Sequence, residues 1–202
     1  MVFNRDKMFT KTQAKIMESF ISKINNKFSI KEIAESLKKP YPLIHRSIKP
    51  LIEQEFILKD NKELLSVNYL ANHAQLSYIE SLRSKKWLKD KTNTLLTKDL
   101  IENINLDFFV LLVFGSSVES NSPRDIDILV IVDEKIDQIE KIGENIASNF
   151  TRKVHFNVIS VKSAYEMLLK REKINVMNET LNKHLILFGA ESYYRILKNA
   201  RQ

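Results

Sequence analysis

Residues 108–130 read FFVLLVFGSSVESNSPRDIDILV: one apolar run ends in Gly115-Ser116, and a second opens with Asp125 and Asp127. Both runs have the length and composition of buried β-strands, and we expect strands over 107–114 and 126–132. Side chains alternate faces along a strand, so Asp125 and Asp127 point to the same side. Two carboxylates in a segment otherwise destined for a core are costly unless a cation neutralises them. The stretch therefore predicts a charged site at one end of a sheet.

The residue types at this site indicate a ligand with phosphates. Mg²⁺ prefers carboxylate oxygens, and its coordination is often completed by substrate phosphates. Gly115 and Ser116 are small enough for the backbone to approach a ligand closely, and a helix starting there would direct free N–H groups at a phosphate. The chain has only 3 glycines, so a glycine at the end of a strand is more informative here than in a glycine-rich chain. A metal-holding pair beside a phosphate-holding turn predicts a nucleoside triphosphate site.

The order Phe114-Gly115-Ser116, polar loop, Asp125-Ile126-Asp127 resembles the signature of the DNA polymerase β-type nucleotidyltransferase superfamily. It is most similar to the minimal nucleotidyltransferase domains of archaea and bacteria, over about residues 106–202. The resemblance implies a magnesium- or manganese-dependent site for an NTP, with ATP the expected nucleotide. It implies that Asp125 and Asp127 are catalytic and hold the metal, and that Gly115, Ser116 and Ser117 bind the nucleotide.

Two features depart from the superfamily pattern. The loop over residues 117–124 is short and lacks a frequent glycine. The superfamily also usually supplies a third carboxylate from a later strand, and here the matching strand, residues 153–159, carries His155 and Asn157 instead. Asn can bind Mg²⁺ but is a poor base, whereas neutral His accepts protons but is a soft ligand. Either residue replaces the missing acid, or both are polar residues on one strand face and the pocket binds without turnover or binds nothing.

The first half of the chain has a different pattern. A helical apolar face begins at Thr10, and Ser29 with Glu32 forms a capping box for a second helix over residues 30–38. A third helix is expected from Pro42, and Pro50 should kink or shorten it. Two short strands around an Asp-Asn turn follow within residues 56–67.

Three short helices and a hairpin resemble a winged helix-turn-helix. The basic charge lies in this part: residues 1–50 hold 11 Lys and Arg against 4 Asp and Glu, and residues 101–202 hold 13 against 14. A basic module of this kind predicts double-stranded DNA as a partner. The third helix would enter the major groove, with Arg46 as the best candidate for a base edge. The other expected DNA contacts are Tyr41, His45, Lys49, Lys38 and Lys39, and Lys59 and Lys62 of the hairpin are expected near the DNA backbone. Alternatively, these residues form a solvated face or a protein-docking surface.

The remaining pattern completes an α+β organisation. We expect helices over 73–91 and 97–105, then alternating strands and helices to the C-terminus. The predicted parts are a winged helix-turn-helix DNA-binding domain (1–72), a helical linker (73–105) and a nucleotidyltransferase-like mixed sheet with flanking helices (106–202). Trp87, the single tryptophan, is expected to pack within one part or to anchor a domain or dimer interface. Tyr193 and Tyr194 are expected in the core or at its rim, and modification of an exposed Tyr is the alternative.

Composition and the distribution of apolar residues narrow the classes of site and of protein that the chain can represent. The chain has no cysteine, which excludes disulfides and thiolate metal sites. No apolar run approaches the length of a membrane span and the N-terminus lacks a signal peptide, so we expect a cytoplasmic protein. A homodimer is expected because winged helices commonly read two-fold sites.

Three functions stay open. The first is a nucleotidyltransferase that modifies a protein or nucleic-acid hydroxyl, coupled to a DNA-binding module. The second is a DNA-binding transcriptional regulator whose second domain is catalytically degenerate and serves as a nucleotide sensor or docking module. The third is an RNA-end-modifying enzyme whose winged helix binds RNA or protein.

Overall fold

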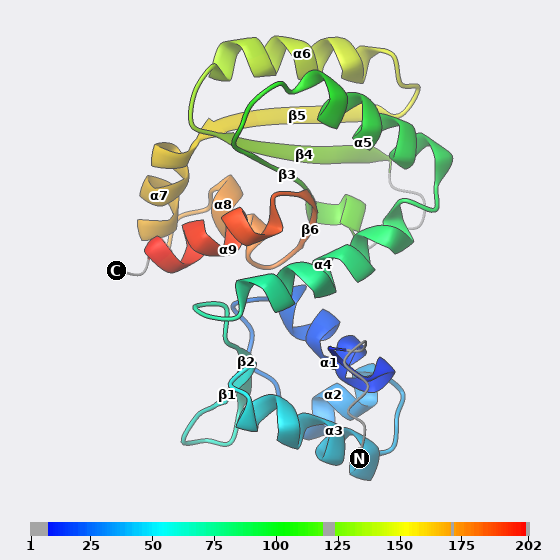
Figure 1. Ribbon diagram of the computed structural model, residues 1–202, viewed down its shortest axis with the longest axis vertical. Helices are drawn as coiled ribbons and strands as arrows, with labels where there is room; N and C mark the ends of the chain where they lie inside the picture. Colours follow the sequence, from blue (N-terminus) through cyan, green and yellow to red (C-terminus); the bar gives the residue numbers. More distant parts are fainter. Residues whose placement is uncertain (1–7, 119–123, 171, 201–202) are drawn as a thin grey trace.

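The computed structural model describes residues 8–118, 124–170 and 172–200 of the chain (Figure 1). These residues form an α+β structure with a two-stranded and a four-stranded sheet. In chain order the elements of the first half are α1 (Lys11–Ile21), α2 (Ile30–Ser36), α3 (Tyr41–Glu53), β1 (Ile57–Lys59), β2 (Leu65–Val67), α4 (His73–Trp87) and α5 (Lys91–Asn103). The second half continues with β3 (Phe109–Phe114), the 3₁₀ turn η1 (Gly115–Val118), β4 (Asp125–Val132), α6 (Ile136–Ser148), β5 (Lys153–Ser160), α7 (Val161–Leu169), α8 (Val176–Thr180), β6 (His184–Phe188) and α9 (Ala190–Asn199).

Residues 9–72, here the N-terminal module, contain three helices and an antiparallel hairpin. The expected capping box is present, because the Ser29 hydroxyl accepts from Glu32 N–H and the Glu32 carboxylate accepts from Ser29 N–H. The hairpin turn is held by the Asp60 carboxylate, which accepts from the N–H groups of Lys62 and Leu64. Local side-chain to backbone hydrogen bonds thus fix both the helix start and the turn.

Of the two effects expected of Pro50, a kink or a shortening of the third helix, the shortening does not occur. Helix α3 continues through Pro50 to Glu53, and the Pro50 carbonyl accepts from Gln54 N–H at the helix end. Proline lacks only its own N–H donor, so in the last turn of a helix it removes a single hydrogen bond. The burial of Ile48 and Leu51 on either side favours continuing the helix.

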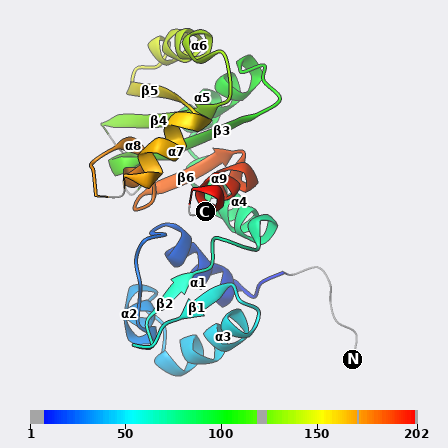
Figure 2. The same cartoon turned by 90° about the vertical axis from the view of Figure 1, so that its left-hand side faces the viewer.

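The four-stranded sheet has the order β5-β4-β3-β6, with β3 antiparallel to both neighbours and β4 parallel to β5. One face is covered by α5 and α6 through residues such as Leu96, Leu100 and Ile139. The other face packs against α4, α7, α8 and α9, and Figure 2 shows these two layers of helices from the side. The alternation of side chains along β3 and β4 therefore feeds two separate apolar clusters, as in a sheet buried on both sides.

Helix α4 lies between the N-terminal module and the four-stranded sheet and contacts α1, α9 and β6 (Figures 1 and 2). Its buried Leu76 and Ile79 belong to an apolar cluster that is continuous from Phe20 of α1 to Leu112 of β3 and Tyr193 of α9. The two halves of the chain therefore share one core along this face.

One sequence-based expectation changes here and another is confirmed. The helix expected over residues 97–105 begins six residues earlier, at Lys91, because the Asp90 side chain caps it by accepting from Asn93 N–H. Tyr193 and Tyr194 are both fully buried, so the core interpretation is confirmed and an exposed modification target is excluded.

Among the described residues, no helix has the length and apolar character needed to span a membrane.

Candidate nucleotide and DNA-binding sites

The predicted acidic pair lies at the start of β4. In the sheet register Asp127 pairs with Phe114 of β3 and His155 of β5, and Asp125 pairs with Lys153. Paired positions on adjacent strands present side chains to the same face, so the two carboxylates and His155 share one face at one end of the sheet.

Gly115 closes this site from β3. Its φ of 68° lies in the left-handed region, and its N–H donates to Lys183 O at 3.3 Å. A Cβ at this position would lie 3.1 Å from Asp127 Oδ2, closer than ordinary van der Waals contact. Both the conformation and the close approach of backbone to carboxylate require glycine here.

The two serines after Gly115 have different environments. Ser116 is exposed, so its hydroxyl is available to a ligand. Ser117 is fully buried and its hydroxyl donates to Phe114 O at 2.7 Å, so this hydroxyl holds the turn and is not presented to a ligand. The predicted helix start is one 3₁₀ turn over Gly115–Val118, and residues 119–123 of the loop lie outside the described residues.

Of the two candidates for the third position, His155 is beside the pair and Asn157 is not. His155 Nε2 lies 3.8 Å from Asp125 Oδ2. Asn157 lies one pleat further along β5, and its amide donates to Ile128 O at 3.3 Å. Within the described ranges, no three His, Asp or Glu side chains converge as a metal site would require.

The electrostatics of the pair differ from the sequence-based argument. The side chain of Asp125 is 48% exposed, so water solvates it and the large cost expected for two buried carboxylates does not arise. No lysine or arginine of the described residues forms an ion pair with Asp125 or Asp127. Two open carboxylates without a cationic partner suit Mg²⁺ if phosphate oxygens and water complete its coordination.

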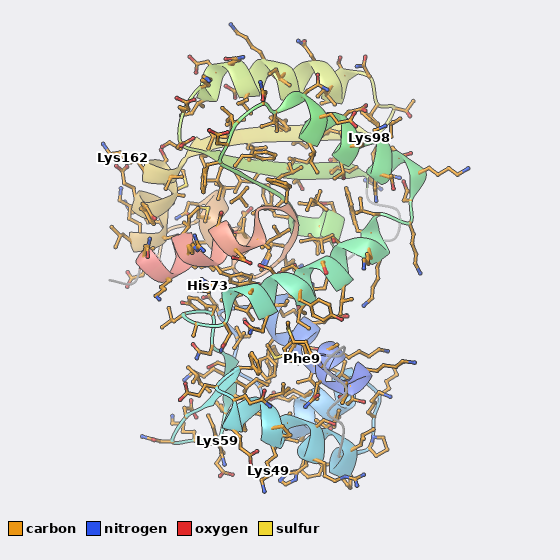
Figure 3. All side chains as sticks on the ribbon, viewed as in Figure 1. Phe9, Lys49, Lys59, His73, Lys98 and Lys162 are labelled. Atoms are coloured by element: carbon orange, nitrogen blue, oxygen red, sulfur yellow. The ribbon has the colours of Figure 1, made fainter. Side chains whose placement is uncertain are left out.

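The expected DNA-reading residues lie on the surface of the N-terminal module. Tyr41, His45, Arg46 and Lys49 are exposed on α3, and the Tyr41 and His45 rings stack with centroids 6.1 Å apart. Lys38 is exposed, Lys39 is half-buried, and Lys49 and Lys59 point outward at the lower end of the molecule (Figure 3). A groove of about 600 Å³ between α3 and the hairpin is lined by Tyr41, His45, Lys49, Lys59 and Lys62.

This groove is not purely cationic. Lys49 lies 3.9 Å from Glu53 and Lys59 lies 2.5 Å from Glu63, and both glutamates also line the groove. Exposed ion pairs of this kind contribute little and exchange partners readily, so a phosphate can replace the glutamate. Arg46 lies outside the groove lining and has no acidic partner among the described residues.

A buried polar cluster was missed at the sequence level. Glu80 and Arg83 of α4 form an ion pair in which Arg83 Nη1 lies 2.8 Å from both Glu80 oxygens. His184 Nε2 lies 3.1 Å from Glu80 Oε1, and the Tyr194 hydroxyl donates to the same oxygen at 3.0 Å. Arg83 Nη2 also donates to the His184 carbonyl, so the cluster ties α4 to β6 and α9.

Ionisation in this cluster is strongly perturbed. Burial raises the pKa of Glu80, but the Arg83 charge and the hydrogen bonds from His184 and Tyr194 outweigh it, so the pKa lies below the usual carboxyl range. Burial, together with the negative charge of Glu80, raises the pKa of Tyr194 well above its usual value. Neither Glu80 nor His184 belongs to a sequence motif. The one signal in the sequence is that Glu80, a charged residue, occupies an apolar position of a helix.

Comparisons with known proteins add little. No family model matches the chain, and no curated protein matches it. Among solved structures, the chain is similar to the crystal structure of Pseudomonas aeruginosa HmgR, with 19% identity and a TM-score of 0.28. That match covers 57% of this chain and 44% of the other, so the chain spans less than half of that protein's length. A TM-score this low does not assign a shared fold.

Proposed function

We propose that this protein is a nucleotidyltransferase that transfers a nucleoside monophosphate from Mg²⁺–NTP to a hydroxyl of a protein or nucleic acid: the hydroxyl oxygen bonds to the α-phosphate, the bond between the α- and β-phosphates breaks, and pyrophosphate leaves. Its β5-β4-β3-β6 sheet with flanking helices is the nucleotidyltransferase-like domain. The N-terminal module is a winged helix-turn-helix that binds double-stranded DNA, and α4 and α5 join the two parts.

The observation that carries the proposal is the contact between Gly115 and Asp127. A left-handed glycine ends one strand directly against a carboxylate of the neighbouring strand, and Asp125 lies on the same face. A structural turn alone requires glycine for its φ, but it does not require two carboxylates beside it that pair with no lysine or arginine of the described residues. The combination brings a surface for a phosphate and a surface for a divalent cation together.

Each residue then has a defined task. Asp125 and Asp127 would hold the metal ion, which would supply neutralisation of the phosphate charge. The exposed Ser116 hydroxyl contacts the terminal phosphates of the nucleotide. His155, in the position of the missing acid, accepts the proton of the attacking hydroxyl. Asp125 and Ser116 are exposed to solvent, as an acceptor as large as a protein or RNA requires.

Calorimetry tests the nucleotide site directly. Wild type should bind at least one of ATP, GTP, CTP and UTP in the presence of Mg²⁺, and Asp127→Asn should lose that binding. Asp133→Asn is the matched control, because Asp133 is exposed at the opposite end of β4. Equal affinity of wild type and Asp127→Asn for every nucleotide would refute the proposed site.

The second candidate is a DNA-binding transcriptional regulator in which the same site senses a nucleotide without turnover. The observation that favours it is the absence of a third carboxylate near Asp125 among the described residues, where His155 stands instead. Metal-dependent NTP binding without transfer to any acceptor would select this function.

The DNA contact is tested separately from the nucleotide site. Arg46→Ala should weaken binding to a specific duplex by about 1–3 kcal/mol at a fixed salt concentration and leave nucleotide affinity unchanged. Arg195→Ala is the matched control, since Arg195 is an exposed arginine on α9 in the other half of the chain. Unchanged affinity and sequence preference in Arg46→Ala would show that α3 is not the reading helix.

Light scattering tests the expected homodimer.

A further inference from the structure

A cleft of about 520 Å³ lies where the N-terminal module meets α4 and the start of α5. One wall is α1, with Lys15, Glu18, Ser19 and Ser22. The facing wall consists of Arg83, Lys86 and Trp87 of α4, Asp90 and Asn93 at the α5 start, Val118 of η1 and Leu185 of β6. Its volume is that of small-molecule sites, which occur preferentially between two parts of a structure.

The cleft is distinct from the nucleotide site. Neither Asp125 nor Asp127 lines it, and Val118 packs in the apolar cluster on the opposite face of the sheet from Asp127. It nevertheless touches η1, the turn that carries Ser116. A ligand bound here would contact both halves of the chain without entering the catalytic centre.

The polar groups of the cleft are mostly paired within the protein. Lys86 pairs with Glu18 across the mouth, and Arg83 pairs with Glu80 beneath the floor. Asp90 accepts from Asn93 N–H as the cap of α5. Within the described part of the chain, this leaves Lys15 as the cation of the lining without an acidic partner.

The apolar part of the lining contains one aromatic ring. Trp87 is half-buried at the end of α4, and Leu37, Val118 and Leu185 complete the apolar surface. A partly open indole stacks well on a flat heterocycle. Asn93, only 6% exposed, also lines the cleft, but its side-chain amide donates to Trp87 O and accepts from Arg152, so it holds the Trp87 backbone in place instead of facing a ligand.

We propose that this cleft binds a small effector with a planar ring, which stacks on Trp87, and one anionic group, which pairs with Lys15. A nucleoside monophosphate and an aromatic carboxylate share this chemistry. The assignment does not depend on the proposed transferase activity, since none of its contacts is a catalytic residue.

Trp87 is the single tryptophan of the chain, so fluorescence excited selectively in the indole, without exciting the 6 tyrosines, reports on this residue. The full-length protein is titrated in EDTA, which removes metal-dependent binding elsewhere, with AMP, GMP, CMP, UMP and salicylate. The half-ligands are the ring without its anion, which is the matching nucleoside or phenol, and the anion alone, which is inorganic phosphate or formate. At least one complete ligand should change the Trp87 fluorescence in a saturable way. Each of its two half-ligands should bind at least about tenfold more weakly than the complete ligand.

Variants on one helix then locate the ligand. Lys15→Ala should weaken binding at least about tenfold, because it removes a charge-assisted contact, whereas Lys11→Ala, an exposed lysine one turn away, should not. Ser19→Phe fills the cleft and should abolish the signal while circular dichroism stays that of wild type. The proposal is overturned if no probe gives a saturable change in wild type, or if the probe that does binds Lys15→Ala and Ser19→Phe as tightly as wild type. The nucleotides and salicylate distinguish a phosphate from a carboxylate ligand.

Discussion

Removing the Glu80 carboxylate should destabilise this protein more than any surface substitution. Glu80 is 1% exposed and its main partner Arg83 is 8% exposed, so the ion pair between them is shielded from water. Glu80→Ala leaves the guanidinium buried without its counter-charge and removes the acceptor for Tyr194. Breaking a buried pair from one side costs about 3–5 kcal/mol.

This loss is large compared with the stability of an ordinary domain, about 5–15 kcal/mol. In a chain of this size each kcal/mol shifts the melting temperature by about 2–4 °C, so Glu80→Ala should melt roughly 6–20 °C below wild type. Glu102→Ala is the matched control. It breaks an exposed ion pair with Lys98, and its effect should stay within about 1 kcal/mol.

The pH dependence of stability gives a second measure of the same cluster. The folded-state pKa of Glu80 is lowered, so its ionised form stabilises the fold above the unfolded-state pKa. That contribution is lost as the pH falls through the folded-state pKa. The unfolding free energy of wild type should therefore fall in acid below about pH 4.3, more steeply than that of Glu80→Gln.

Urea unfolding followed by circular dichroism and by Trp87 fluorescence measures both effects. The reasoning is refuted if Glu80→Ala unfolds within about 1 kcal/mol of Glu102→Ala at neutral pH. Parallel pH profiles for wild type and Glu80→Gln would refute the assignment of a lowered pKa to Glu80.

Three further substitutions test single features. Gly115→Ala should cost about 1–2 kcal/mol from the left-handed φ and weaken Mg²⁺–NTP binding, because its Cβ crowds Asp127; calorimetry and urea unfolding measure the two effects. Gly143→Ala places a Cβ 2.0 Å from the Phe156 ring, and the overpacking of about 1–3 kcal/mol should be relieved by adding Phe156→Leu, as a double-mutant cycle would show. Ser29→Ala removes the α2 cap and should lower the unfolding free energy by about 0.5–2 kcal/mol; an unchanged urea midpoint would contradict this.

Local signals in the sequence predicted local structure well. The apolar runs around Gly115 and Asp125 form the central antiparallel strand pair, and the capping box at Ser29 starts a helix as expected. Helix α5 begins six residues before the expected Thr97 because its first four residues, 91–94, are all polar and carry no apolar periodicity, and the Asp90 cap is the local signal that marks its start.

The rest depends on contacts between distant residues. His184 lies 104 residues after Glu80, so no periodicity or spacing connects the two members of the buried cluster. The exposure of Asp125 and the burial of Ser117 depend on how strand ends and the η1 turn meet the helices around them. The residue types in the sequence could indicate a phosphate and metal site. Only the register of β4 and β5 shows that His155, and not Asn157, lies beside the acidic pair.

Transfer of label from α-labelled nucleotides is the most direct test of the proposed function. Wild type and Asp125→Asn/Asp127→Asn are incubated with labelled ATP, GTP, CTP or UTP and Mg²⁺ or Mn²⁺, with and without host lysate. The account predicts label on a protein or RNA band with wild type only, and the nucleotide and the band then identify the substrate class. The absence of transfer from every nucleotide, or transfer that persists in the double variant, would contradict it.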